Sequence, residues 1–110
     1  MLAIWGGVVA RAVDGERLTL SVVELDAGAV IPEHAHENEQ LGLLLAGSMR
    51  FHAGEEECDA VPGTTWSIPA NVPHEVEVGP EGAVVVEVFA PPRLDWSVLP
   101  EEPPRPPRWP

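Results

Sequence analysis

The sequence predicts an all-β fold, a sandwich or barrel built from short strands. Three observations predict it. Short apolar runs rich in Val and Leu recur along the chain, and turns rich in Gly, Pro and Asp separate them at regular intervals. No segment sustains the period of an amphipathic helix. At 110 residues, the chain is long enough for one hydrophobic core and too short for two.

The first predicted hairpin lies near the N-terminus. It pairs residues 8–13 with residues 18–25, because Asp14-Gly15 between two such runs is typical of a tight β-turn. The further strand candidates follow in chain order: 29–31, 40–45, 48–53, 57–61, 65–68, 75–78 and 83–89.

Alternation within residues 48–53 predicts which side chains face the core. Met49, Phe51 and Ala53 share one face of the strand, and Arg50 and His52 share the other. We therefore expect His52 to be a solvated strand residue.

The chain changes character from Pro91 onward. Residues 1–99 are predicted to hold the barrel, and residues 100–110 form a proline-rich tail without a core of its own. Trp96 and Trp109 offer apolar anchors, so we expect this extended segment to lie on the barrel or on a partner subunit.

Composition limits the possible functions. A net charge of −12 disfavours nucleic acid and anionic membranes as partners, since both attract basic surfaces. The absence of lysine and tyrosine excludes Schiff-base chemistry and a tyrosine acid. Cys58 is the single cysteine, so no intramolecular disulfide is possible. Neither a signal peptide nor a long apolar run is visible, which makes the cytoplasm the expected compartment.

Three of the four histidines have spacing that suits one metal centre. His34 and His36 are two residues apart, so on an extended chain their imidazoles point to the same side. His74 arrives from a separate segment that a closed β fold would bring to them. Imidazole suits Zn, Ni, Fe and Cu, so the sequence predicts a divalent transition metal.

These motifs resemble the two signatures of the cupin superfamily. The first runs from Gly28 to Gly47 around His34 and His36, and the second contains Gly63, Pro69 and His74. The resemblance implies a small double-stranded β-helix, a jelly-roll-like barrel, with a metal held by three histidines and one oxygen ligand.

Three positions depart from the signatures. Gln40 stands where the first signature has Glu; it is the expected fourth ligand, with Glu39 as the alternative. The second signature's Gly and Asn positions hold Asn71 and Val78.

Within the superfamily, the chain is most similar to the KdgF-type pectin-degradation cupins. The similarity lies in residues 34–42, 68–74 and 87–95. It implies His, His, Gln and His as ligands, and it implies ring opening of 4,5-unsaturated uronates. It also carries the catalytic Asp, Phe and Arg of that family to Glu87, Phe89 and Arg93, with Glu87 one methylene longer than Asp.

The expected function is a metal-dependent isomerase- or lyase-type enzyme that acts on a small, possibly anionic sugar acid. Zn, Ni, Mn, Fe and Cu all suit the predicted ligands. Two alternatives stay open, a metal-dependent dioxygenase and a small-ligand-binding cupin without catalysis. Exposed sheet edges and the tail predict a homodimer.

Overall fold

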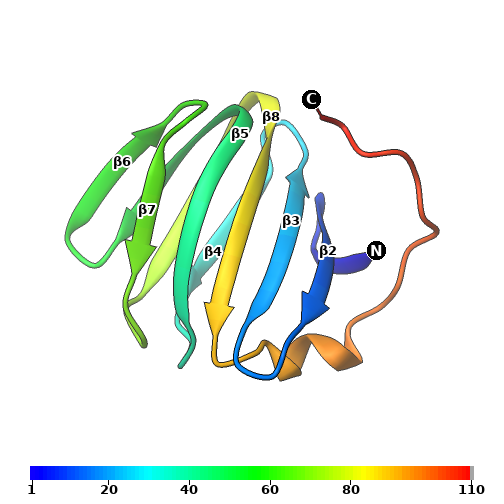
Figure 1. Cartoon of the computed structure of the whole chain (residues 1–110). Helices are drawn as coiled ribbons and strands as arrows, with labels where there is room; N and C mark the ends of the chain where they lie inside the picture. The colour runs from blue at the N-terminus through cyan, green and yellow to red at the C-terminus, as the bar shows by residue number, and fades with distance from the viewer. Residues whose placement is uncertain (110) are drawn as a thin grey trace.

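The computed structural model describes residues 1–109, which form a curled antiparallel sheet of eight strands and one short 3-10 helix (Figure 1). This is the all-β double-stranded β-helix that the sequence predicts. The elements in chain order are β1 Leu2–Trp5, β2 Val8–Asp14, β3 Thr19–Leu25, β4 Val30–His34, β5 Glu39–Ala53, β6 Glu56–Ala60, β7 Thr65–Ile68, β8 His74–Ala90 and η1 Leu94–Val98.

Strands β5 and β8 are the backbone of the barrel. The strand order is β1-β2-β3-β8-β5-β6, with β4 also paired to β8 and β7 also paired to β5. Both long strands bend, so the first half of β8 pairs with β4 and its second half pairs with β3. This bend brings the end of β4 and both ends of β8 to one mouth of the barrel.

The prediction that these two strands are each split by a turn is wrong. Residues 40–45 and 48–53 belong to one strand, as do 75–78 and 83–89. Gly47 lies where the pairing register shifts, and it marks a bulge rather than a chain reversal. A Cβ at Gly47, whose φ is +81°, would lie 1.9 Å from the Gly82 carbonyl oxygen, so this crossing needs glycine.

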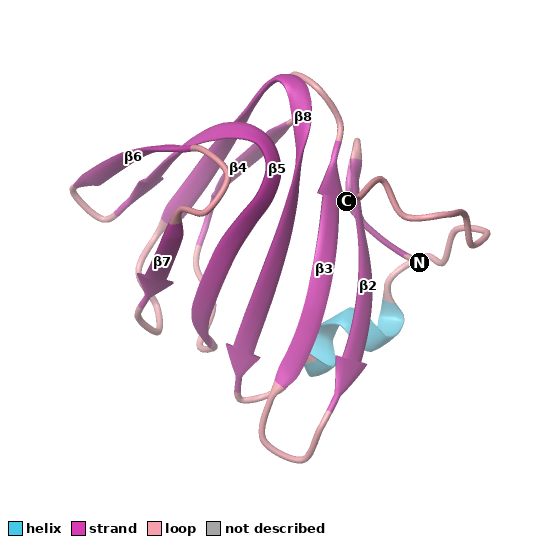
Figure 2. Ribbon diagram, turned by 45° about the horizontal axis from the view of Figure 1, so that its top comes forward, coloured by secondary structure: helices cyan, strands magenta, loops and turns pink. Residues whose placement is uncertain are grey.

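Two further elements differ from the expectations. Strand β1 was not predicted, and it pairs with β2. The segment after Pro91 is not extended throughout, because residues 94–98 form a 3-10 helix. Figure 2 shows this helix beside the lower ends of β2 and β3. Trp96 holds it there by packing edge-on against the Phe89 ring, with 5.2 Å between the centroids.

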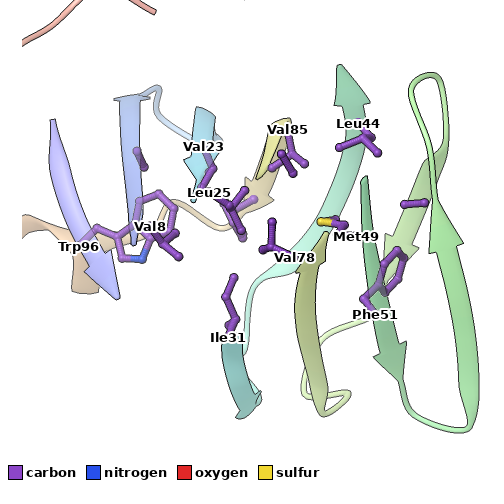
Figure 3. Close-up of a cluster of buried hydrophobic side chains, with 14 residues drawn as sticks. Val8, Val23, Leu25, Ile31, Leu44, Met49, Phe51, Val78, Val85 and Trp96 are labelled. Atoms are coloured by element: carbon purple, nitrogen blue, oxygen red, sulfur yellow. The ribbon is translucent and has the colours of Figure 1, made fainter. Parts of the chain in front are cut away.

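The hydrophobic core fills the inside of the curled sheet. Met49 and Phe51 are buried and Ala53 packs against them, while Arg50 is exposed, which confirms the predicted faces of that strand. Figure 3 shows the core side chains that point inward from both halves of the sheet. The buried members are Val8, Ala10, Val23, Leu25, Ile31, Leu44, Met49, Phe51, Ala60, Val78, Ala83, Val85, Phe89 and Trp96.

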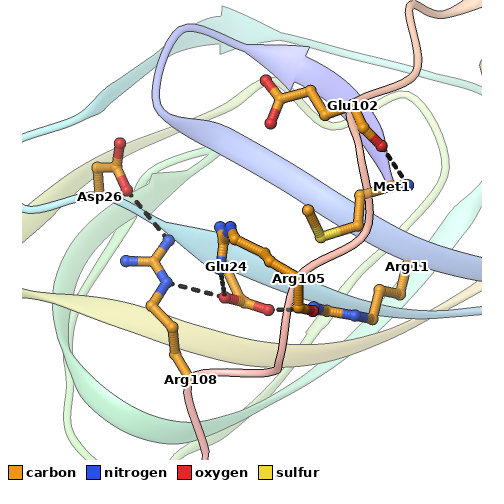
Figure 4. A network of polar contacts seen from close by, with 7 residues as sticks. All are labelled: Met1, Arg11, Glu24, Asp26, Glu102, Arg105 and Arg108. Carbon is orange, nitrogen blue, oxygen red and sulfur yellow. Dashed lines mark hydrogen bonds and ion pairs between the residues drawn. The ribbon is translucent and has the colours of Figure 1, made fainter.

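The proline-rich tail returns along the barrel and is tied to it by charge. Glu24 is fully buried on the outer side of β3, and its carboxylate accepts hydrogen bonds from Arg11, Arg105 and Arg108 (Figure 4). Burial opposes ionisation of Glu24, yet hydrogen bonds from the three arginines lower its pKa from 4.5 to about 2. Trp109 packs against Arg11 at 5.7 Å. The tail therefore lies on its own barrel.

Within residues 1–109, no helix is both long enough and apolar enough to cross a membrane.

Candidate metal centre

Three histidines from two strands and a turn meet at the mouth of the barrel. His34 ends β4 and His74 begins β8, and the two are direct partners across this antiparallel pair. His36 follows in the turn before β5. One ring nitrogen of each histidine lies within 4.8 Å of those of the other two. The ring centroids of His34 and His74 are 4.2 Å apart, and those of His36 and His74 are 4.9 Å apart.

The backbone fixes the tautomer of each imidazole. Nδ1 of His34 lies 2.9 Å from the Pro32 carbonyl, Nδ1 of His74 lies 2.9 Å from the Val72 carbonyl, and Nδ1 of His36 lies 2.9 Å from the Asn38 carbonyl. A carbonyl oxygen only accepts, so each Nδ1 carries the proton and donates it. Each Nε2 is thereby left with a lone pair, which is the state in which imidazole ligates a metal.

Gln40 completes the group. It is buried at the start of β5, and its Oε1 lies 3.1 Å from Nε2 of His36. With the tautomer set by the backbone, these two atoms are both acceptors, and a cation between them would turn their repulsion into attraction. Glu39, the alternative ligand, is exposed on the opposite side of the strand. The structure thus places Gln40, and not Glu39, beside the histidines.

The electrostatics of the centre favour neutral ligands. Burial lowers the pKa of His34, His36 and His74, and the Arg93 guanidinium lowers all three further. Neutral imidazoles and an amide oxygen form a borderline-soft donor set, so these residues fit a divalent transition ion. His52 takes no part, because it lies half-exposed near Glu57.

The residues with predicted catalytic roles open onto the same space. A cavity of about 50 Å³, partly open to solvent, is lined by His34, Gln40 and His74 together with Glu87, Phe89 and Arg93. Glu87 and Phe89 are two residues apart and share the inner side of β8, as their spacing predicts. Phe89 forms a wall, with its ring centroid 5.8 Å from that of His36. The rest of the lining is mostly aliphatic.

Arg93 is held rigidly at the edge of this cavity. Its guanidinium lies over the Phe89 ring at 4.8 Å and the Trp96 ring at 4.6 Å. Nε and Nη2 donate to the two carboxylate oxygens of Asp95 at 3.1 and 3.0 Å. An ion pair of this kind is also an ordinary structural role for an arginine. Nη1 has no hydrogen-bond partner among residues 1–109, and it remains available for a ligand.

Glu87 is the one carboxylate inside the cavity. Its side chain opens onto the cavity, and its carboxyl group makes no hydrogen bond to another residue in the range 1–109. Burial raises its pKa to about 7, against the opposing charge of Arg93. A carboxyl group with this pKa is populated in both protonation states near neutral pH.

Sequence reasoning missed one residue that organises the centre. Asn38 is buried, its carbonyl accepts from His36, and its side chain donates to the carbonyls of Pro91 and Pro92 at 2.5 and 3.3 Å. It joins the turn that carries His36 to the segment that leads to Arg93. In the sequence, an asparagine between two acidic residues is typical of a turn. Only the tertiary fold shows that Asn38 connects these two segments.

Comparison with known proteins agrees with the fold. The Cupin_2 family model, described as Cupin domain, matches residues 21–89, while no curated protein matches the sequence. The fold resembles that of KdgF from Halomonas sp., at 24% identity and a TM-score of 0.78, over 84% of this chain and 86% of that one.

Two other solved structures are similar. An RmlC-like cupin from Shewanella frigidimarina has 23% identity and a TM-score of 0.79, over 86% of this chain and 85% of that one. An oxalate decarboxylase variant from Bacillus subtilis has 27% identity and a TM-score of 0.72, over 77% of this chain but 26% of that one. With its barrel, its three histidines and a family match over most of its length, the chain belongs to the Cupin_2 family of cupin domains.

Proposed function

We propose that this cupin is a metal-dependent enzyme, without net redox change, that opens the ring of a 4,5-unsaturated uronate to give the open-chain keto sugar acid. One observation carries the proposal: a carboxyl group, a guanidinium and three of the four metal-ligand candidates line one cavity, and the fourth candidate, His36, lies next to them. The fold shared with KdgF of Halomonas supports it.

The metal ligands would be His34, His36, Gln40 and His74. A divalent ion held there would supply Lewis acidity toward a ring oxygen or hydroxyl of the substrate. Gln40 is neutral, so the bound ion would keep more positive charge than it would beside a glutamate.

Arg93 would bind the substrate carboxylate. Its guanidinium is already fixed between two aromatic rings and Asp95, so little side-chain entropy is lost when the ligand arrives. The carboxylate would meet Nη1, the nitrogen that Asp95 leaves unused, in a charge-assisted hydrogen bond.

Glu87 would move the proton. Ring opening releases a proton from the anomeric hydroxyl, and ketone formation takes one up at carbon, so the reaction is an isomerisation that needs a group able to accept and donate. A carboxyl group with a pKa of about 7 meets that requirement at neutral pH.

The test follows the absorbance of the conjugated 4,5-unsaturated uronate with metal-loaded protein. Arg93→Ala should raise KM, because a desolvated carboxylate that loses its partner costs roughly 2–5 kcal/mol. Glu87→Gln keeps the shape and should mainly lower kcat, by about 10²–10⁴-fold. Arg50→Ala removes an exposed arginine paired with Asp59 and serves as the control. A wild type that leaves the absorbance at the spontaneous rate would rule out this function.

The metal itself is tested by elemental analysis of the purified and reconstituted protein. We expect one equivalent of Zn, Ni, Mn, Fe or Cu, lost in His74→Ala. Less than about a tenth of an equivalent after reconstitution would contradict the ligand assignment.

The second candidate function is a metal-dependent dioxygenase. Its support is the three-imidazole donor set beside a mostly aliphatic cavity, which suits an apolar substrate. Oxygen uptake by the iron- or copper-loaded protein with an enediol or a flavonol is the discriminating measurement. Metal binding without turnover in either assay would leave the ligand-binding cupin.

A further inference from the structure

Trp5 lines the candidate cavity, and the proposed function gives it no role. It ends β1 and packs beside His34, with 4.8 Å between the centroids of the two rings. The indole is partly exposed, so a ligand that enters the cavity can reach it. Tryptophan offers a large, rigid apolar surface, and ligand pockets commonly use such a surface to orient what they bind.

The backbone of β1 is shaped so that Trp5 faces the cavity. Adjacent residues of a regular strand point to opposite sides, yet Ile4 and Trp5 both line the cavity. The cause is a bulge, because Ala3 pairs with Val9 and Trp5 pairs with Val8, which leaves Ile4 as the extra residue. Bulges next to active sites re-aim side chains in this way. The bulge thus adds an apolar side chain that a regular strand would have turned away from the cavity.

The tail holds β1 from its other edge. The Ala3 N–H donates to the Pro100 carbonyl at 2.9 Å, and the Glu102 N–H donates to the Met1 carbonyl at 2.7 Å. The Met1 amino group donates in return to the Glu102 carbonyl (Figure 4). Strand β1 therefore lies between β2 and the tail. Trp5 is held in position before a ligand arrives, which limits the entropy lost on binding.

The cavity is small, and two strands each contribute an aromatic ring to it. Trp5 contacts His34 from β1, and Phe89 on β8 lies 5.8 Å from His36. A volume of about 50 Å³ holds roughly four water molecules. A whole uronate ring is larger than this, so only one end of it can enter. In a 4,5-unsaturated uronate, the end that carries the carboxylate is flat, because the double bond keeps C4, C5 and the carboxylate carbon in one plane.

We propose that Trp5 is a specificity-determining residue whose indole packs on the flat, unsaturated end of the uronate ring while Arg93 binds the carboxylate. A saturated uronate is a chair with substituents above and below C4 and C5, so it makes a poorer contact with a flat indole. This assignment rests on the proposed function for the identity of the ligand. It adds the feature by which the site distinguishes the unsaturated ring from the saturated one.

Isothermal titration calorimetry tests the contact on the full chain reconstituted with Zn, in the Glu87→Gln background, where turnover is slow. The ligands are a 4,5-unsaturated uronate and galacturonate, a saturated uronate. Trp5→Ala should raise the Kd of the unsaturated uronate about tenfold and that of galacturonate by less than about threefold. Trp109→Ala, the same truncation on a residue that does not line the cavity, should leave both values unchanged.

Two readouts separate contact with the ligand from support of His34. Trp5→Ala should keep its metal affinity within about twofold in chelator competition, and circular dichroism should show an intact barrel. Trp5→Phe keeps a ring for packing and should raise the Kd of the unsaturated uronate about threefold, and it replaces the alanine variant if that one unfolds. Weaker metal binding with an unchanged Kd in the loaded protein would overturn the proposal, because Trp5 would then only support His34. An equal loss for both ligands would overturn it as well.

The outcome for the reaction is separate from the outcome for Trp5. A wild type that binds the unsaturated uronate through Trp5 but leaves its absorbance at the spontaneous rate would keep this assignment and rule out the proposed reaction. Turnover with a KM that Trp5→Ala does not change would keep the reaction and overturn the assignment. A wild type that binds neither uronate would overturn both.

Discussion

Removal of the charge from Glu24 tests how the tail is fastened. In Glu24→Gln, the shape of the buried side chain is kept, but Arg11, Arg105 and Arg108 lose the carboxylate that they share. Removing one partner of a buried ion pair costs about 3–5 kcal/mol. These arginines are 28–39% exposed and regain water, so we expect a smaller loss, about 2–3 kcal/mol.

The pKa leads to a similar magnitude. A fall from 4.5 in the unfolded chain to about 2 in the fold corresponds to about 3 kcal/mol, and to about 2 kcal/mol after solvent screening. This contribution is complete above pH 4.5 and is lost as the pH falls toward 2. The stability difference between wild type and Glu24→Gln should therefore shrink over that window.

Urea unfolding followed by tryptophan fluorescence measures the difference, because Trp109 and Trp96 report on the tail and the barrel. At neutral pH, the loss should lower the melting temperature by about 10 °C. Glu16→Gln, in an exposed turn, is the matched control. A change below about 0.5 kcal/mol, or a difference independent of pH between 2 and 4.5, would refute this account of the cluster.

Three further predictions concern the cavity and the barrel. Because burial raises the pKa of Glu87 to about 7, ionisation destabilises the fold as the pH rises from 4.5 through 7. In urea unfolding of the metal-free proteins, the free energy of unfolding of Glu87→Gln should then be about 1–2 kcal/mol higher than that of wild type at alkaline pH. The two values should be equal near pH 4. Asn38→Ala frees the His36 turn and should weaken metal affinity roughly tenfold in chelator competition; unchanged affinity would contradict the bridge. Gly47→Ala meets backbone at 1.9 Å and should cost more than about 2 kcal/mol, whereas Gly28→Ala, with positive φ but open space, should cost less.

Much of the barrel is local in origin and could be predicted. The hairpin around Asp14-Gly15, the faces of Met49 and Phe51 and the shared side of Glu87 and Phe89 all follow from turn chemistry and a two-residue period. Gly47 and Gly79 were harder to interpret, because each stands at a predicted break between two strand candidates. In the sequence, a glycine between two apolar runs is typical of a turn. Only the pairing of β5 with β8 shows that each strand continues through a bulge.

The candidate site was predictable in its ligands but not in its supports. Spacing puts His34 and His36 on one side of an extended chain, and the resemblance to cupins implies that His74 joins them. The carbonyls that orient them, the bridge through Asn38 and the partner of Arg93 depend on segments far apart in the chain. The same is true of Glu24, a charged residue of a type that is ordinarily exposed. Tail arginines from more than 80 residues away bury it instead.

Adjacent residues of strand β8 point to opposite sides of the sheet. Glu87 faces the cavity, whereas its neighbours Val86 and Val88 point to the outer side of the sheet. One added residue in the bend before Ala83 would exchange the two sides and present the carboxylate to the outside and valines to the ligand. The inward and outward side chains of β8 therefore depend on one register, and an insertion cannot move one set without moving the other.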